Sequence, residues 1–193
     1  MKIIRINADA QTVSRWSGGT TTQLAIFPEG AVYADRDFLW RISSAVVELP
    51  ESDFTPLPDY DRILMILNGE LTLSHDGGEE YTLHALEQTS FDGASHTYSR
   101  GQVTDFNLMM RKGRCTGRVE AGKVDGDGSS LCLNAEYDKH LFYCAGGEVQ
   151  INVGNENCRL SVGDALLIEG KDDAVQCALH GNGVVVLAEV NER

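Results

Sequence analysis

A block of sequence that occurs twice limits what this 193-residue chain can fold into. Residues 66–73 read ILNGELTL, and residues 144–151 repeat the pattern 78 positions later as CAGGEVQI. Residues 90–93 (SFDG) return as residues 167–170 (LIEG), 77 positions later. Each copy has the order strand, Gly-Glu turn, strand, loop, strand, glycine. One supersecondary unit used twice predicts two halves built on the same plan.

The strands that these halves need are visible as alternating apolar and polar residues. Segments 39–47, 62–67 and 184–190 alternate with a period of two, which is the period of a β-strand. Glycine-containing turns separate the segments at short intervals, and many short strands favour a sandwich or barrel. With the repeat, this pattern resembles the tandem β-barrel of bicupins. We therefore expect an all-β bicupin with two cupin-like (double-stranded β-helix or jelly-roll) halves, residues 1–113 and 114–193.

The charge balance limits the partners of the chain. Sixteen basic against 29 acidic residues give a net charge of −13, and a field of this sign repels nucleic acid and anionic membranes. No apolar run approaches the ~18 residues that span a bilayer, and the first residues, MKIIRIN, become polar too early for a secretory signal. The five cysteines form no Cys-x-x-Cys pair, which favours free thiols in the cytoplasm. We therefore expect a cytoplasmic protein without nucleic-acid or membrane partners, in which a few arginines in a concave site would capture any anion.

Histidine spacing argues against the metal site that many cupins carry. Such cupins usually present two close histidines, a following carboxylate and a distant third histidine. Here no two of the five histidines lie within eight residues of each other, and none begins a His-x-His. We therefore predict no metal and no other cofactor. The chain also lacks a Gly-x-Ser-x-Gly elbow and the Lys-Ser/Thr ending of a phosphate loop, so no catalytic residue is assigned.

Polar residues inside three strand-like segments point to a ligand site in the N-terminal half: residues 16–28, residues 37–46, and residues 59–67 together with 104–111. In a barrel the polar faces of these segments would bring together Arg41, Ser43, Asp105 and Asn107, with Arg62 and Gln23 nearby. An ion pair between Arg41 and Asp105 would satisfy a buried guanidinium, which is costly when unpaired. Alternatively, the planar fork of arginine suits two-point capture of a carboxylate. The spacing leaves both interpretations open.

These segments resemble the HutD/Ves family. The resemblance covers roughly residues 1–113 and is carried, in order, by residues 16–28, 38–45, 54–62 and 101–109. It implies a bicupin without metal-binding motifs, and members of the family often accompany histidine-utilisation genes and are thought to bind a small acid of that pathway. The pocket residues that it implies are Trp16, Gly18, Gly19, Thr20, Arg41, Ser43, Arg62, Asp105 and Asn107, to which the strand pattern adds Gln23.

One departure from the family affects the expected ligand. Many members have a longer turn after the tryptophan, with an asparagine and three glycines, whereas here the turn is Ser17-Gly18-Gly19. We expect the shorter turn to change the depth of the pocket and the identity of its ligand.

Two functions remain open from the sequence. In the first, the chain binds a small carboxylate, such as urocanate or a formylated or formiminated glutamate, and tunes histidine utilisation or a related amino-acid catabolic pathway. In the second, it is a metal-independent isomerase, lyase or hydrolase with Asp105 as general base and His84 or His96 as proton carrier. We expect arginine to lower the pKa of Asp105 and weaken it as a base, which favours binding over catalysis. A purely structural or interaction protein is a third alternative, in which two copies could form a homodimer through sheet faces.

Overall fold

The expected all-β fold is confirmed by a computed structural model, which describes residues 1–126, 128–170 and 175–193. Strands β1 to β17 are joined by turns and by the short 3₁₀ turns η1 (Ala8–Ala10) and η2 (Tyr33–Asp35). Within these described ranges, no helix has the length and apolar character needed to cross a membrane.

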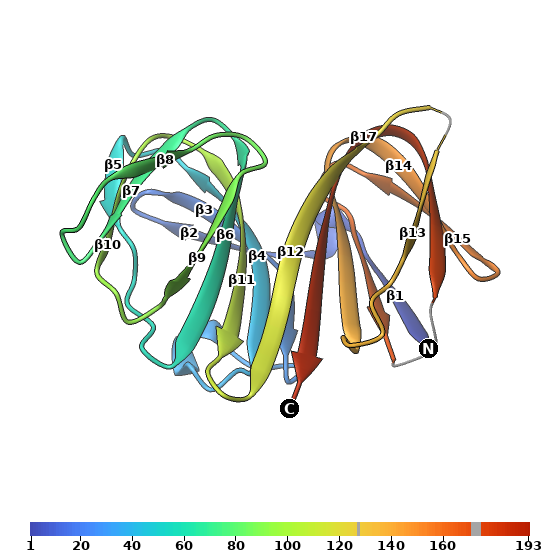
Figure 1. The fold of residues 1–193 in the computed structure, drawn as a ribbon, viewed down its shortest axis with the longest axis horizontal. Coiled ribbons are helices and arrows are strands. Elements are labelled where there is room, and N and C mark those ends of the chain that lie inside the picture. The colour runs from blue at the N-terminus through green and yellow to red at the C-terminus, as the bar shows by residue number, and fades with distance from the viewer. Residues whose placement is uncertain (127, 171–174) are drawn as a thin grey trace. The chain divides into compact units, whose positions relative to one another are not determined.

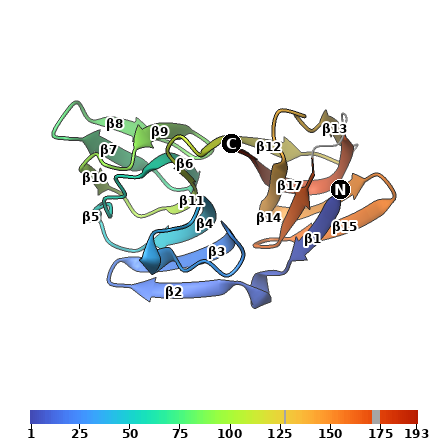
Figure 2. The same ribbon diagram turned by 90° about the horizontal axis from the view of Figure 1, so that it is seen from below.

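Residues 12–115 form one compact unit of two antiparallel sheets (Figure 1). The larger sheet has the order β2-β3-β4-β11-β6-β9, with bounds β2 (Thr12–Trp16), β3 (Gly19–Phe27), β4 (Trp40–Val47), β11 (Thr104–Arg111), β6 (Tyr60–Asn68) and β9 (Gln88–Asp92). The smaller sheet has the order β5-β10-β7-β8, with bounds β5 (Glu51–Asp53), β10 (Thr97–Arg100), β7 (Leu71–His75) and β8 (Tyr81–Leu83). Figure 2 shows β2 at the outer edge of the larger sheet, beside β3.

Residues 1–11 and 116–193 form the second compact unit. Its sheet has the order β1-β16-β14-β17-β12, with β13 beside β17 and β15 beside β14. The bounds are β1 (Lys2–Ile6), β16 (Ala165–Glu169), β14 (Lys139–Val153), β17 (Gln176–Glu192), β12 (Cys115–Val124), β13 (Ser129–Cys132) and β15 (Glu156–Ser161). Because β1 pairs with β16, the first residues of the chain belong to this unit. The boundary expected at residues 113 and 114 falls between β11 and β12.

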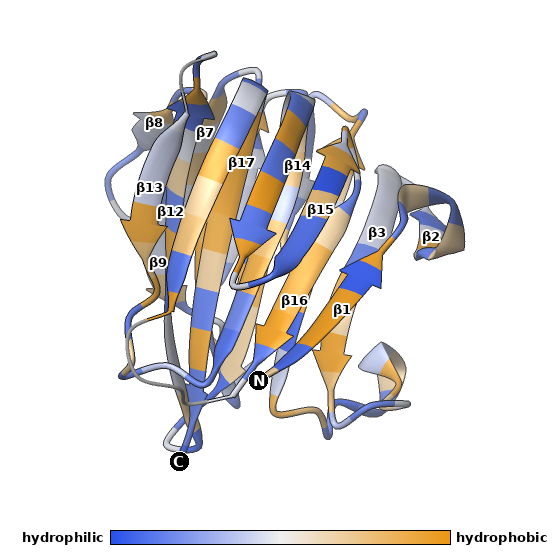
Figure 3. Ribbon diagram, turned by 90° about the vertical axis from the view of Figure 1, so that its right-hand side faces the viewer, coloured by the Kyte–Doolittle hydropathy of each residue, from blue (hydrophilic) through white to orange (hydrophobic). Residues whose placement is uncertain are grey.

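Alternating side chains give each unit an apolar core. In residues 12–115 one core cluster consists of Val47, Leu64, Ile66, Leu71, Leu73, Leu83 and Val103. In the second unit the core includes Phe142, Cys144, Leu166, Ile168, Val185 and Leu187. Figure 3 shows the bands of apolar and polar residues along β14 and β17 that result from this alternation. Full burial of one such large side chain contributes ~1.5–3 kcal/mol to stability, so each core stabilises the sheets of its own unit.

The sequence repeat corresponds to a structural repeat. The strand order β4-β11-β6-β9 in one sheet matches β12-β17-β14-β16 in the other. Arg62 of β6 pairs with Phe91 of β9, and His140 of β14 pairs with Ile168 of β16. These equivalent residues are 78 and 77 positions apart, as in the sequence repeat. The two sheets can therefore be compared residue by residue.

Candidate functional site

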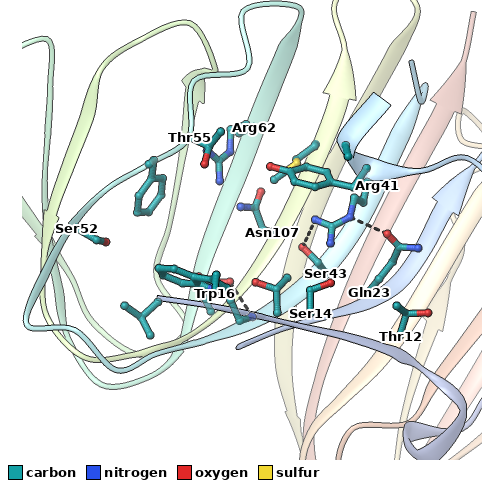
Figure 4. Close-up of a pocket in the computed structure, with 18 of the residues that line it drawn as sticks. Thr12, Ser14, Trp16, Gln23, Arg41, Ser43, Ser52, Thr55, Arg62 and Asn107 are labelled. Atoms are coloured by element: carbon teal, nitrogen blue, oxygen red, sulfur yellow. Dashed lines mark hydrogen bonds between the residues drawn. The ribbon is translucent and has the colours of Figure 1, made fainter. Parts of the chain in front are cut away.

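A cavity of about 920 Å³ opens in the unit formed by residues 12–115. Side chains from β2, β3, β4, β6 and β11 line it, together with Tyr33 of η2 and Phe54, which follows β5. Its volume is that of a small-molecule site, since ligand pockets usually enclose ~300–1,000 Å³. Figure 4 shows the polar side chains around this space.

A row of side chains crosses the larger sheet from β4 to β6 and faces the cavity. Met109 of β11 lies directly opposite Arg41 on one side and Arg62 on the other. Two residues along β11, Asn107 lies opposite Ser43. Period-two alternation places these residues on one face, and the four polar ones are all buried. A buried polar group is costly without a partner, so the partners of each group are informative.

Neutral groups hold Arg41 in place. Its Nε donates to Oε1 of Gln23 at 2.9 Å and its Nη1 donates to Oγ of Ser43 at 3.1 Å, as the dashed lines in Figure 4 show. The Cζ atom lies 4.4 Å from the ring centroid of Tyr33. Burial lowers the pKa of Arg41, against the opposing effects of Tyr33 and Asp105. The two hydrogen-bond partners of the guanidinium are therefore neutral, and Asp105 acts on it through its charge alone.

Arg62 is a second buried cation beside the cavity. Its Cζ lies 5.0 Å and 5.1 Å from the ring centroids of Phe54 and Phe91, distances at which an aromatic ring attracts a cation. Burial lowers the pKa of Arg62 to about 10, which leaves the group charged at neutral pH. Its Nε is shielded from solvent and has no hydrogen-bond partner among the described residues. An unsatisfied buried donor costs ~1–3 kcal/mol, so a ligand that offers an acceptor would relieve this cost.

The pKa of Asp105 differs from our expectation. We expected the arginines to lower it, but burial raises it to about 7, against the opposing effects of Arg62, the backbone N–H of Ala45 and Arg41. That N–H donates to Oδ1 of Asp105 at 3.2 Å. The expectation was wrong because desolvation of the enclosed carboxyl group outweighs the attraction of the two cations. Asp105 therefore changes its protonation state close to neutral pH.

Asn107 adds an acceptor to the same region. Its Oδ1 is shielded from solvent and, among the residues that the structure describes, has no hydrogen-bond partner. Figure 4 places the amide of Asn107 between Arg62 and Ser43. Unpartnered buried polar atoms are rare in folded proteins and call for a physical account. The region thus lacks both an acceptor for Nε of Arg62 and a donor for Oδ1 of Asn107.

The β2–β3 hairpin contributes Trp16 to the cavity wall, with 40% of its surface exposed. A Cβ at Gly18 would lie 2.1 Å from the Trp16 ring, and one at Gly19 would lie 1.9 Å from the carbonyl oxygen of Val46. These glycines therefore permit close packing of the hairpin. Gly18, Gly19 and Thr20 are not among the described residues that line the cavity. The other candidates do line it: Trp16, Gln23, Arg41, Ser43, Arg62, Asp105 and Asn107.

Sequence reasoning missed the aromatic partners of the two arginines. Tyr33 and Phe54 lie outside regular strands, where alternation gives no signal, and Phe91 was noted only as part of the repeat. Alternation did place Met109 on the same face as Asp105, but assigned it no role. His84 and His96, the suggested proton carriers, pair instead with Glu70 and Asp53. Neither histidine is among the described residues that line the cavity.

Comparison with known proteins gives matches in both sequence and structure. A sequence model of the family described as HutD matches residues 8–187. Protein Ves of Cronobacter sakazakii (strain ATCC BAA-894) is 32% identical over 116 residues, a match that covers 55% of this chain and 60% of that protein. The chain thus spans less than two thirds of the length of this curated relative.

Solved structures that match over the whole of both chains include two from Pseudomonas. The conserved protein of unknown function PA5104 from Pseudomonas aeruginosa PAO1 has a TM-score of 0.88 and 24% identity. HutD from Pseudomonas fluorescens SBW25, in a formate condition, has a TM-score of 0.79 and 23% identity. At these identities the likeness concerns the fold alone. The tandem cupin-like fold expected from the sequence is confirmed.

Proposed function

This chain belongs to the HutD family, and we propose that it binds a small carboxylate in the cavity of residues 12–115. The observation that carries the proposal is the pair of buried guanidinium groups, Arg41 and Arg62, on either side of Met109. Arg41 is held by neutral partners, and Nε of Arg62 has no partner among the described residues. A carboxylate would supply an acceptor for Nε of Arg62 and negative charge in addition to that of Asp105.

The unpartnered Oδ1 of Asn107 narrows the proposed ligand class. This acceptor favours a ligand that carries an N–H group in addition to its carboxylate. Urocanate, with its imidazole, and formylated or formiminated glutamate, with an N–H on the substituted nitrogen, both have this combination. We propose that binding tunes histidine utilisation or a related catabolic pathway, a role that would place the protein in the cytoplasm.

Ligand-induced stabilisation tests this proposal. The purified protein is titrated with urocanate, formylglutamate, formiminoglutamate and glutamate while its thermal unfolding is recorded. A ligand at 100 times its Kd adds ~2.7 kcal/mol, which should raise Tm by roughly 5–10 °C in a chain of this size. The shift should be absent in Arg41→Ala and unchanged in Arg100→Ala, which removes an exposed arginine that pairs with Glu80 in the smaller sheet. An unchanged shift in Arg41→Ala would reject the site.

A second candidate function, acid–base catalysis without a metal, is favoured by the pKa of Asp105. At about 7, this pKa is close to the operating pH that general acid–base catalysis requires. The test is to incubate the same acids with the protein and follow them by proton NMR. Turnover that disappears in Asp105→Asn, while binding persists, would establish an enzyme. Binding without turnover would establish the first function.

A further inference from the structure

The second unit contains a buried polar cluster that the cavity does not use. The carboxylate of Glu189, only 1% exposed, lies at its centre. Nδ1 of His140 lies 2.9 Å from its Oε1, and the backbone N–H of Asn134 donates to the same oxygen at 3.2 Å. Nε of Arg118 donates to the other oxygen, Oε2. Burial alone would raise the pKa of Glu189, but these three partners together lower it, so the group is charged at neutral pH.

The repeat assigns Glu189 to the position of Met109. Glu189 lies opposite His140 as Met109 lies opposite Arg62, and His140 follows Arg62 by the 78 positions of the repeat. The carboxylate of Glu189 therefore projects from the same place in its sheet as the side chain that separates the two arginines of the cavity.

Arg118 resembles Arg41 in its strand and in its tyrosine contact, although its side chain is 39% exposed and also pairs with Glu120. Its strand, β12, lies beside β17 as β4 lies beside β11. The Cζ of Arg118 lies 5.6 Å from the ring centroid of Tyr137, and that of Arg41 lies 4.4 Å from the ring centroid of Tyr33. Each unit thus presents an arginine with a tyrosine against its guanidinium, on the strand next to the central position.

Apolar residues replace the rest of the polar row in the second unit. Val185 takes the position of Asp105 and Leu187 that of Asn107, because the pairs Val185–Cys144 and Leu187–Phe142 correspond to Asp105–Ile66 and Asn107–Leu64. Val185 and Leu187 belong to the apolar core of their unit. Of the polar row, the second unit therefore retains only the charged groups around Glu189.

We propose that the second unit holds a carboxylate-binding site, the counterpart of the cavity in the first unit, and that its own Glu189 occupies this site as a built-in ligand. Truncation of Glu189 at Cβ removes the heavy atoms of acetate. The site therefore takes a carboxylate no larger than acetate once the side chain is gone. This proposal stands on contacts within the second unit. Only its extension, that Arg41 and Arg62 hold an external carboxylate in a similar way, rests on the proposed function.

Chemical rescue of Glu189→Ala tests the proposal. The loss of the buried carboxylate leaves His140 without this partner and Arg118 with Glu120 alone, so we expect Tm to fall by roughly 5–10 °C. Acetate at about 50 mM should then raise the Tm of the variant by on the order of 3 °C, whereas sodium chloride at the same ionic strength should leave it unchanged. Formate should rescue less than acetate because it leaves the place of Cγ empty, and a longer acid such as butyrate should not fit. A decrease in Tm that acetate does not reverse specifically would reject the proposal, and so would an unchanged Tm in Glu189→Ala.

Matched variants distinguish acetate binding at this site from acetate binding in the cavity of the first unit. The comparison is made in an Arg41→Ala background, with and without Glu189→Ala, so that acetate binding in the first unit contributes nothing to the difference. Glu189→Gln fills the site with a neutral group and should not respond to acetate. Arg118→Ala added to Glu189→Ala should abolish the rescue. If Glu189→Ala does not fold, refolding from denaturant in acetate and in chloride gives the same test: recovery in acetate alone supports the proposal, and equal failure rejects it.

Discussion

Arg62 and His140 occupy equivalent positions in the two large sheets, one in each unit, and lie 78 residues apart in the sequence. Opposite Arg62 the neighbouring strand places Met109, whereas opposite His140 it places Glu189. Arg62 therefore faces a cavity, whereas His140 contacts an internal carboxylate. The duplicated scaffold therefore combines one filled polar site with one open site.

Replacement of Arg62 by methionine should separate stability from binding. Burial of a charge without a hydrogen-bonded partner is costly, and Nε of Arg62 has no partner among the described residues to lose. We expect the ligand-free Tm of Arg62→Met to equal or exceed that of the wild type, while the ligand-induced shift disappears. Differential scanning fluorimetry with and without the acid measures both. Arg100→Met, at an exposed ion pair, is the control and should keep the shift. A large fall in the ligand-free Tm would mean that Arg62 supports the fold rather than a ligand.

Tryptophan fluorescence should report occupation of the cavity. The chain has two tryptophans: Trp16 lines the cavity with 40% of its surface exposed, and Trp40 is 1% exposed. A ligand that displaces water from Trp16 should shift the emission to shorter wavelength, and Trp16→Phe should abolish the change while lowering affinity by less than about tenfold, since it keeps an aromatic ring. Calorimetry on both proteins supplies the affinities. Unchanged wild-type emission at saturating ligand would place the ligand elsewhere.

Substitution of Gly18 should act through Trp16. A Cβ at this position would lie 2.1 Å from the Trp16 ring, so the ring must move in Gly18→Ala. We expect the emission of the ligand-free variant to differ from that of the wild type and its affinity for the acid to fall. In a Trp16→Phe background the added methyl group still meets an aromatic ring, so affinity should fall there as well. In a Trp16→Ala background Gly18→Ala should have little effect on affinity. An equal loss in all three backgrounds would show that Gly18 contacts the ligand itself.

Alternation along the strands was enough to predict which polar residues share a face. It placed Arg41 with Ser43, and Asp105 with Asn107, because strand periodicity is a local property of the chain. The repeat likewise predicted the tandem fold, since both copies carry the same turns. The local pattern could not predict that β1 pairs with β16, because strand pairing between distant segments depends on the packed fold.

The predictions about the site that were incomplete or wrong failed for the same reason, because they depended on the packed fold. Phe54 reaches Arg62 from a segment without regular structure, and its position is set by packing of the two sheets. The raised pKa of Asp105 depends on how completely the carboxyl group is enclosed, which no spacing of residues encodes. Sequence reasoning considered the attraction of nearby arginines and omitted desolvation, which is the larger effect here.

The pKa of Asp105 predicts how stability changes with pH. Its value is about 7 in the folded chain and 3.8 for the free side chain, so the folded state holds a proton that the unfolded state has released between these values. The contribution of protonated Asp105 to the free energy of unfolding is fully present below pH ~4 and is lost as pH rises to about 7. Relative to Asp105→Asn, the Tm of the wild type should therefore fall between pH 4 and 7 and then run parallel to that of the variant. A constant difference across this range would contradict the raised pKa.

Binding should follow the same protonation step. A carboxylate ligand is repelled by ionised Asp105 and accepted beside the neutral form, so affinity should fall between pH 6 and 8 by on the order of tenfold. The measurement needs an acid without groups that titrate in this range, such as formylglutamate, in an isothermal titration at each pH. Asp105→Asn should bind with an affinity that is independent of pH in this window. Tighter binding of the acid at pH 8 than at pH 6 would show that ionised Asp105 contacts a donor of the ligand.

Met109→Glu should convert the open site into a filled one. Met109 is buried and lies directly opposite both Arg41 and Arg62, and opposite residues in a sheet have Cβ atoms ~4.5–5.5 Å apart. A carboxylate at this position can therefore reach both guanidinium groups, as Glu189 reaches Arg118 and His140. We expect Met109→Glu to fold with a Tm at or above that of the wild type and to lose at least ~10-fold in affinity for the acid. Met109→Gln, which has the same size without the charge, should keep most of the binding. Equal losses in the two variants would mean that size and not charge excludes the ligand, and wild-type affinity in Met109→Glu would place the acid away from the two arginines.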